Sequence, residues 1–118
     1  MAETSVLVVD DEPRVRRLLA WVMSGEGWDV HTVGDAETAL EQIGELRPDV
    51  ALVDIRLPGM NGIELSQRIK ERDGTHVVLM SAYEQPREHA GDAFVAKPFD
   101  IQELTRLITD MVERDRTG

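Results

Sequence analysis

The chain has 118 residues, of which 42% are hydrophobic and 31% charged, and it carries a formal net charge of −10 at pH 7. This length suits one domain, here residues 1–118, and the absence of cysteine excludes disulfides and thiolate chemistry. The acidic balance argues against binding nucleic acid or an anionic membrane, because both need Lys and Arg to neutralise phosphates. No apolar run approaches the roughly 20 residues that span a bilayer, and no signal peptide precedes the first strand. We therefore expect a soluble, cytoplasmic domain.

The chain opens with a strand and an amphipathic helix. The β-branched, apolar run Ser5–Val9 predicts a central parallel strand, and it ends on two acids, Asp10 and Asp11. A helix is expected next, because Pro13 suits a first helical turn and apolar residues recur at helical spacing as far as residues 25–27. The stripe expected to face the core comprises Val15, Leu18, Leu19 and Val22.

A second strand and helix precede the most informative stretch of the sequence. Asp29–Val33 predicts a strand, and Asp35 is the expected N-cap of the following helix. The apolar run at residues 50–53 then predicts a strand buried on both faces, which stops at Asp54 before the turn residues 58–59. The expected buried face of the preceding helix comprises Ala36, Ala39, Leu40 and Ile43.

The second half of the chain repeats the alternation. A helix with Ile63, Leu65 and Ile69 as its apolar positions leads to a fourth strand at residues 76–80, which ends at Ser81. A short fifth strand, Ala93–Ala96, ends at Lys97. The last helix is expected to begin at the N-cap Asp100, with Glu103 completing a capping box, and to give way to a frayed polar tail at residues 113–118. Its apolar stripe comprises Ile101, Leu104, Leu107, Ile108 and Met111.

Alternating strands and helices predict an α/β fold, with one doubly wound, five-stranded parallel sheet and helices on both faces. The expected strand order is 2-1-3-4-5, which leaves a crevice between the first and third strands at their carboxyl ends. Asp10, Asp11 and Asp54 all follow strands that end at this crevice.

Residues far apart in the sequence should therefore share one edge of the sheet. Three neighbouring carboxylates, Asp10, Asp11 and Asp54, repel one another unless a hard cation such as Mg²⁺ neutralises them. Lys97 and Ser81 can bind an anion opposite the acids, so the set describes a phosphoryl site. Taken singly, each residue has a plainer interpretation: Asp11 as a helix cap, Asp54 or Ser81 as a turn residue, Lys97 as a surface lysine.

The remaining basic and imidazole side chains predict no further site. Arg14, Arg16 and Arg17 form the only basic cluster, and their polar spacing is typical of the solvated face of a helix. The histidines show no ligand spacing, so we interpret them as structural or exposed.

Four motifs resemble, in order and spacing, the receiver domain of two-component response regulators, the CheY-like family. They are VVDDEP at 8–13, VDIRLPGMNG at 53–62, MSAY at 80–83 and KPF at 97–99. The resemblance implies that Asp54 accepts a phosphoryl group from a histidine kinase. It also implies that Asp11, Asp54 and the backbone carbonyl of Arg56 hold Mg²⁺, with Asp10 acting mainly through water. Such a module catalyses its own phosphorylation but is a signalling protein and not an enzyme.

The same resemblance assigns further roles around the site. Ser81 and Phe94 would form the switch, with Ser81 moving toward the phosphoryl group and Phe94 turning into the vacated space. Arg56 and Tyr83 lie at two variable positions, where we expect them to tune dephosphorylation by controlling the access of water. The bond between Lys97 and Pro98 resembles the family's cis peptide.

One segment departs from the family pattern. Only eleven residues, 82–92, separate Ser81 from the fifth strand, which is shorter than the usual segment by about six residues. Pro86 and Gly91 restrict any helix there to residues 86–90, so we predict that the helix between the fourth and fifth strands is absent, reduced to one turn or mobile. The face that it shares with the fifth strand and last helix would then bind a second copy of the chain or an effector in a non-standard way.

Two other functions use the same acids. A Mg²⁺-dependent phosphatase or phosphotransferase acting on a small substrate would need a substrate pocket, for which the sequence offers no long loop. A receiver-like scaffold would not need Asp10, Asp11, Asp54 and Lys97, all of which are present. The sequence fits either a complete single-domain regulator or the N-terminal receiver of a longer protein.

Overall fold

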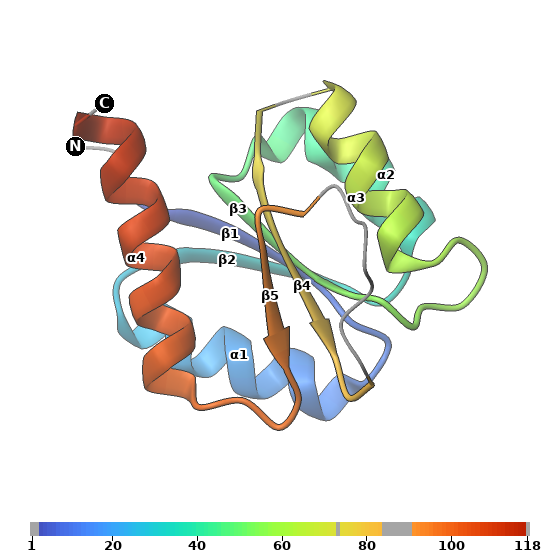
Figure 1. The fold of residues 1–118 in the computed structure, drawn as a ribbon, viewed down its shortest axis with the longest axis horizontal. Helices are drawn as coiled ribbons and strands as arrows, with labels where there is room; N and C mark the ends of the chain where they lie inside the picture. The colour runs from blue at the N-terminus through green and yellow to red at the C-terminus, as the bar shows by residue number, and fades with distance from the viewer. Residues whose placement is uncertain (1–2, 73, 84–90, 118) are drawn as a thin grey trace.

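Figure 1 shows the computed structural model of the chain, which describes residues 3–72, 74–83 and 91–117. Five parallel strands form one sheet in the order β2-β1-β3-β4-β5, which confirms the predicted fold class and strand order. The strands are β1 (Ser5–Val9), β2 (Asp29–Val33), β3 (Val50–Asp54), β4 (His76–Ser81) and β5 (Ala93–Ala96). The helices among the described residues are α1 (Pro13–Gly25), α2 (Ala36–Leu46), α3 (Gly62–Arg72) and α4 (Ile101–Thr117).

Helices cover both faces of the sheet, with α2 and α3 on one side and α1 and α4 on the other (Figure 1). Because successive strand residues point to opposite faces, each inner strand supplies both cores. Leu7 of β1 and Val53 of β3 pack toward α2 and α3, whereas Val8 and Leu52 pack toward α1 and α4. Every residue of β3 is buried, which confirms the prediction that this apolar run is covered on both sides.

Short polar side chains fix where three of these helices begin. Asp35 Oδ1 accepts the backbone N–H of Thr38 at 2.7 Å, and Asn61 Oδ1 accepts that of Glu64 at 2.9 Å. Asp100 Oδ1 accepts the N–H groups of Gln102 and Glu103 at 2.8 and 3.2 Å. Each bond satisfies a donor that the first helical turn leaves unpaired, so the predicted caps at residues 35 and 100 are confirmed.

The predicted core stripe of α1 is wrong at one position. Leu18 is 43% exposed, whereas Met23, which the sequence analysis left out, is fully buried beside Leu19. Successive residues turn by about 100° around a helix, so Leu18 and Leu19 cannot both point at the centre of the sheet. The helix is rotated to bury Leu19 and Met23, and the apolar spacing alone does not fix that rotation.

The carboxyl end of the chain also differs from the expected frayed tail. The helix α4 continues through Thr117 and includes most of the polar residues at 113–118. His76 at the start of β4 lies with Nε2 2.6 Å from Asp115 Oδ2, a contact between segments 39 residues apart. This contact ties the last turns of α4 to the sheet.

Two other predictions concern the helix between β4 and β5 and a membrane-spanning segment. The expected loss or shortening of the helix between β4 and β5 falls mainly on residues 84–90, which lie outside the described residues. Within the described ranges, no helix combines the length and apolar character needed to cross a bilayer.

Candidate functional site

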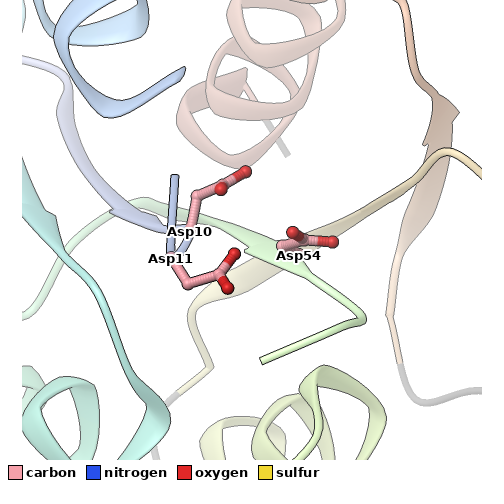
Figure 2. A group of neighbouring side chains, drawn as sticks. All are labelled: Asp10, Asp11 and Asp54. Carbon is pink, nitrogen blue, oxygen red and sulfur yellow. The ribbon is translucent and has the colours of Figure 1, made fainter. Parts of the chain in front are cut away.

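Three carboxylates meet at the carboxyl ends of β1 and β3. Asp10 and Asp11 follow β1, and Asp54 is the last residue of β3. Figure 2 shows the three side chains grouped at this edge, and one oxygen from each lies within 4.8 Å of the others. Asp10 is fully buried and Asp54 is 6% exposed, whereas Asp11 is open to solvent. Parallel pairing of β1 with β3 brings the acids together, as the strand order requires.

Lys97 joins the two buried acids. Its Nζ lies 2.7 Å from Asp10 Oδ2 and 3.3 Å from Asp54 Oδ2, and the lysine side chain is only 14% exposed. Lys97 directly follows β5, and its backbone N–H donates to the carbonyl of Ser81 at 2.8 Å. The peptide bond between Lys97 and Pro98 is cis. Lys97 therefore brings a positive charge from the edge strand to the acids at the centre of the sheet.

Burial and neighbouring charges shift the pKa values of Asp54 and Lys97. Burial raises the pKa of the Asp54 carboxyl, the charge of Lys97 opposes that change, and the nearby Asp10 carboxylate reinforces it, so that the pKa lies above its ordinary value. Burial alone lowers the pKa of Lys97, but its hydrogen bond to Asp10 and the charges of Asp10 and Asp54 outweigh burial and raise it. Lys97 is therefore protonated at neutral pH and is a permanent cation in the site.

The backbone after β3 holds Asp54 in place. The N–H of Arg56 donates to Asp54 Oδ1 at 3.2 Å, and the N–H of Gly62 donates to the carbonyl of Ile55 at 2.8 Å. A Cβ added at Gly62 would collide with the backbone carbonyl oxygen of Asp54. Only glycine lets the first residue of α3 pack directly against the backbone that carries Asp54.

Ser81 and Phe94 lie on neighbouring strands at the same face of the sheet. Ser81 ends β4, is 2% exposed, and accepts the backbone N–H of Tyr83 on its Oγ at 3.0 Å. It pairs in register with Ala96, and Phe94 lies two residues earlier on β5, which places both side chains on one face. Phe94 is partly buried against the core under α2 and α3. The two side chains are diagonal neighbours between the site and the edge of the sheet.

Arg56 and Tyr83 lie beside the acids and contact each other. The Arg56 guanidinium lies over the Tyr83 ring, 4.0 Å from its centroid. Both residues line a cavity of about 290 Å³ together with Asp11, Asp54 and Lys97. The sequence motifs gave the two positions next to the site, but this stacking was not anticipated.

Arg16 is the residue near the site that sequence reasoning missed. Its spacing with Arg14 and Arg17 predicts a solvated helix face, and those two side chains are exposed. Arg16 is half-buried, and its Nη1 donates to the backbone carbonyl of Asp10 at 2.6 Å. The available signal was its place in the first turns of α1, which begin beside the end of β1.

The site can hold a cation and an anion side by side. Its carboxylate oxygens are the ligands that hard divalent cations prefer, and they are spaced so that one ion could contact three of them. Lys97 and Arg56 line the same cavity and supply positive charge for an anionic group. This combination suits the binding of a metal ion together with a phosphoryl group.

Comparison with known proteins gives consistent similarities. The family model described as the response regulator receiver domain matches residues 6–109. The chain is 36% identical over 116 residues to the DNA-binding response regulator MtrA of Mycolicibacterium smegmatis, an alignment that covers 93% of this chain and 51% of MtrA. The chain thus spans about half the length of that relative.

Two solved structures of one protein are also similar. The response regulator protein TrrA of Thermotoga maritima, in complex with Mg(2+)-BeF, has a TM-score of 0.84 and 32% identity, with 92% of this chain and 98% of that chain covered. TrrA in complex with the histidine kinase ThkA has a TM-score of 0.82 and 31% identity, with coverages of 92% and 97%.

The raised pKa of Asp54 predicts a stability change in Asp54→Asn. Because the folded-state pKa lies above the ordinary value of 3.8, ionisation of Asp54 costs stability, fully so above the folded-state pKa. We expect Asp54→Asn to melt a few degrees higher than the wild type at pH 7 in EDTA, and the gain to vanish below pH 3.8. Melting curves across this pH range, with the exposed Asp11→Asn as control, measure the effect. A variant no more stable than the wild type at pH 7, or equally stabilised at pH 3, contradicts the assignment.

Proposed function

The chain belongs to the response regulator receiver domain family, and from this membership we propose that Asp54 accepts a phosphoryl group from the phosphohistidine of a histidine kinase. The observation that carries the proposal is the bridge from Lys97 Nζ to the carboxylates of Asp10 and Asp54, at 2.7 and 3.3 Å. Asp54 is buried beside the Lys97 ammonium, and it also lines the cavity that a phosphoryl group would enter. The related TrrA was solved with the histidine kinase ThkA, which supports a kinase as the partner.

The proposed reaction is a nucleophilic displacement at phosphorus. A carboxylate oxygen of Asp54 attacks, a P–O bond forms, and the P–N bond of the phosphohistidine breaks with its electron pair left on the imidazole. The Lys97 ammonium stabilises negative charge on the phosphoryl oxygens, because it already lies beside Asp54. The signal ends when water attacks the same phosphorus atom, which releases phosphate and restores the carboxylate.

Mg²⁺ is the metal that fits this donor set. Asp11, Asp54 and the backbone carbonyl of Arg56 would hold the ion, and Asp10 would act mainly through water. Three carboxylate oxygens within 4.8 Å meet the preference of Mg²⁺ for hard oxygen ligands, and TrrA was solved with Mg(2+)-BeF. When bound, the ion neutralises charge on the acids and on the phosphoryl oxygens.

Ser81 and Phe94 are the proposed link from the site to the surface. Ser81 Oγ accepts a hydrogen bond from the N–H of Tyr83 at 3.0 Å. On phosphorylation it moves away from this donor toward the phosphoryl oxygens. That movement frees space on the shared sheet face for the Phe94 ring to turn inward. Since Phe94 has no hydroxyl, its position is read through packing and not through a new hydrogen bond.

The proposed output surface is the face formed by β5 and α4. A cavity of about 400 Å³ lies there, and its lining includes Phe94, Val95, Phe99, Leu104 and Leu107. An effector or a second copy of the chain would bind this partly apolar face and sense the Phe94 position. DNA binding is named for the longer relative MtrA; we propose that this acidic domain does not itself contact nucleic acid.

Phosphorylation of Asp54 is the first test. The wild type, incubated with Mg²⁺ and acetyl phosphate, is expected to gain the mass of one phosphoryl group, because Asp54 offers a nucleophile beside Lys97. Asp54→Asn should gain none, whereas Asp110→Asn, which alters an exposed acid of α4, should behave as the wild type. Intact mass spectrometry measures the product. A wild type that gains nothing favours the scaffold reading, and a labelled Asp54→Asn places the acceptor elsewhere.

The switch predicts a fluorescence change that depends on Ser81. In Phe94→Trp the new indole should change its emission on phosphorylation, and adding Ser81→Ala should remove the change while a mass gain persists. Emission of the wild type corrects for Trp21 and Trp28. Val95→Trp is the control, because Val95 packs toward the opposite face of the sheet. Equal responses with and without Ser81 would argue against the switch.

We predict that the stacking of Arg56 on Tyr83 slows hydrolysis of the phosphorylated protein. Arg56→Ala and Tyr83→Ala should each speed the decay of phosphorylated protein several-fold, because the pair restricts the access of water to the cavity. The double variant should add little, since both residues act through one contact. The decay is followed by mass spectrometry after removal of acetyl phosphate. Arg68→Ala, an exposed arginine of α3, is the control, and unchanged decay in both single variants would remove the tuning role.

A further inference from the structure

Arg16 makes the only side-chain bond to the carbonyl of Asp10 among the described residues. The guanidinium Nη1 lies 2.6 Å from that oxygen, the length of a strong, charge-assisted hydrogen bond. The N–H of Asp10 still bonds to the Val33 carbonyl at 3.1 Å, but β2 ends at Val33 and no strand continues beside the next peptide. Arg16 therefore takes the place of a strand partner where β1 runs out.

The surrounding chain leaves room for Arg16 at this point. A Cβ at Gly34 would lie 3.1 Å from Nη1 and 3.6 Å from Cζ, so the guanidinium rests where any larger residue would press on it. Helix α1 has no side-chain hydrogen bond at its N-cap Glu12, unlike α2. The bond from Arg16 thus fastens the first turns of α1 to the end of β1.

The peptide that Arg16 holds is the one joining two acids of the site. The Asp10 side chain is separately fixed by Lys97 and by the N–H of Glu12, which donates to Asp10 Oδ1 at 2.9 Å. Asp11 is exposed, and the direction of its side chain depends on the orientation of the peptide before it. With the carbonyl of Asp10 fixed, the Asp11 carboxylate is kept near Asp10 and Asp54.

We propose that Arg16 is a positioning residue for cation binding, holding the peptide between Asp10 and Asp11 so that the Asp11 carboxylate completes the acidic cluster. This inference rests on the proposed function, in which the cluster binds Mg²⁺. It assigns no contact between Arg16 and the ion. Outer partners that orient metal ligands commonly change affinity by about 10- to 100-fold when they are removed.

If Arg16 acted only through its positive charge, its removal would strengthen cation binding, whereas loss of positioning would weaken it. The two effects can therefore be told apart. Removing a positive side chain near three acids makes the site more negative and should tighten cation binding. Arg16→Ala and Arg17→Ala remove the same charge from the same helix, but only Arg16 bonds to the site. A loss of affinity confined to Arg16→Ala therefore reports positioning.

The experiment measures Mg²⁺ binding to the full chain by calorimetry, with a melting curve in EDTA for each variant. We expect the Kd of Arg16→Ala to rise about tenfold and that of Arg17→Ala to stay within about twofold of the wild type. Arg16→Lys and Arg17→Lys form a second pair that keeps the charge. There we expect only Arg16→Lys to bind more weakly, because the lysine ammonium, on a stem of different length and shape, does not reproduce the position from which Nη1 donates. This pair decides the question if Arg16→Ala does not fold.

The outcomes separate the two proposals. A wild type that does not bind Mg²⁺ overturns the proposed function and this inference with it. A wild type that binds, together with equal Kd values in the matched Arg16 and Arg17 variants, overturns the inference alone. A higher Kd only in the Arg16 variants, in folded protein, supports it.

Discussion

The contact of the Lys97 ammonium with two buried carboxylates, at the carboxyl edge of the sheet, is the interaction on which the rest of the site depends. Asp10 and Asp54 are buried next to each other, where carboxylates repel and where burial alone penalises both charges. Lys97 reaches both acids and supplies the opposite charge in their midst. The remaining excess of negative charge, with Asp11 at the open side, favours a divalent cation. Burying charged groups at this edge stabilises the fold less than apolar packing would, and such a cluster of buried charges is typical of a binding site.

The fold supports this site with contacts that are individually ordinary. Parallel pairing aligns the strand ends, and the closing helices must approach them closely. Gly62 allows α3 to begin directly on the backbone of Asp54, and Arg16 ties α1 to the end of β1. Lys97 is positioned by its bond to the Ser81 carbonyl, so the cation and the proposed switch residue share one strand pair. Asp54, Ser81 and Lys97 thus lie at the neighbouring carboxyl ends of β3, β4 and β5.

On the proposed function, this arrangement would couple phosphorylation of Asp54 to recognition of a partner without a large substrate pocket. The cavity at the acids is about 290 Å³, large enough for a phosphoryl group but modest for a further substrate. On the proposed function, the partner brings the phosphoryl donor, and the output depends on the repacking of Phe94. The chain matches about half the length of the relative MtrA.

The sequence determined the features that local chemistry controls. Apolar strands that end on Asp10, Asp54 and Lys97 predicted both the sheet and the residues at its edge, because parallel strands end together. Asp35 and Asp100 marked helix starts, since a cap acts on backbone donors two or three residues away. These signals lie within a few residues of what they control, so they can be found without coordinates.

Tertiary structure decided the features that depend on neighbours distant in the chain. The rotation of α1 that buries Met23 and exposes Leu18 is set by the sheet beneath it, and α4 extends through Thr117 where Asp115 meets His76. Arg16 looked like its exposed neighbours in the sequence; only the end of β2 and the space over Gly34 direct it to the carbonyl of Asp10. Long side chains have many rotamers, and the choice among them is made by surrounding segments that the local sequence does not contain.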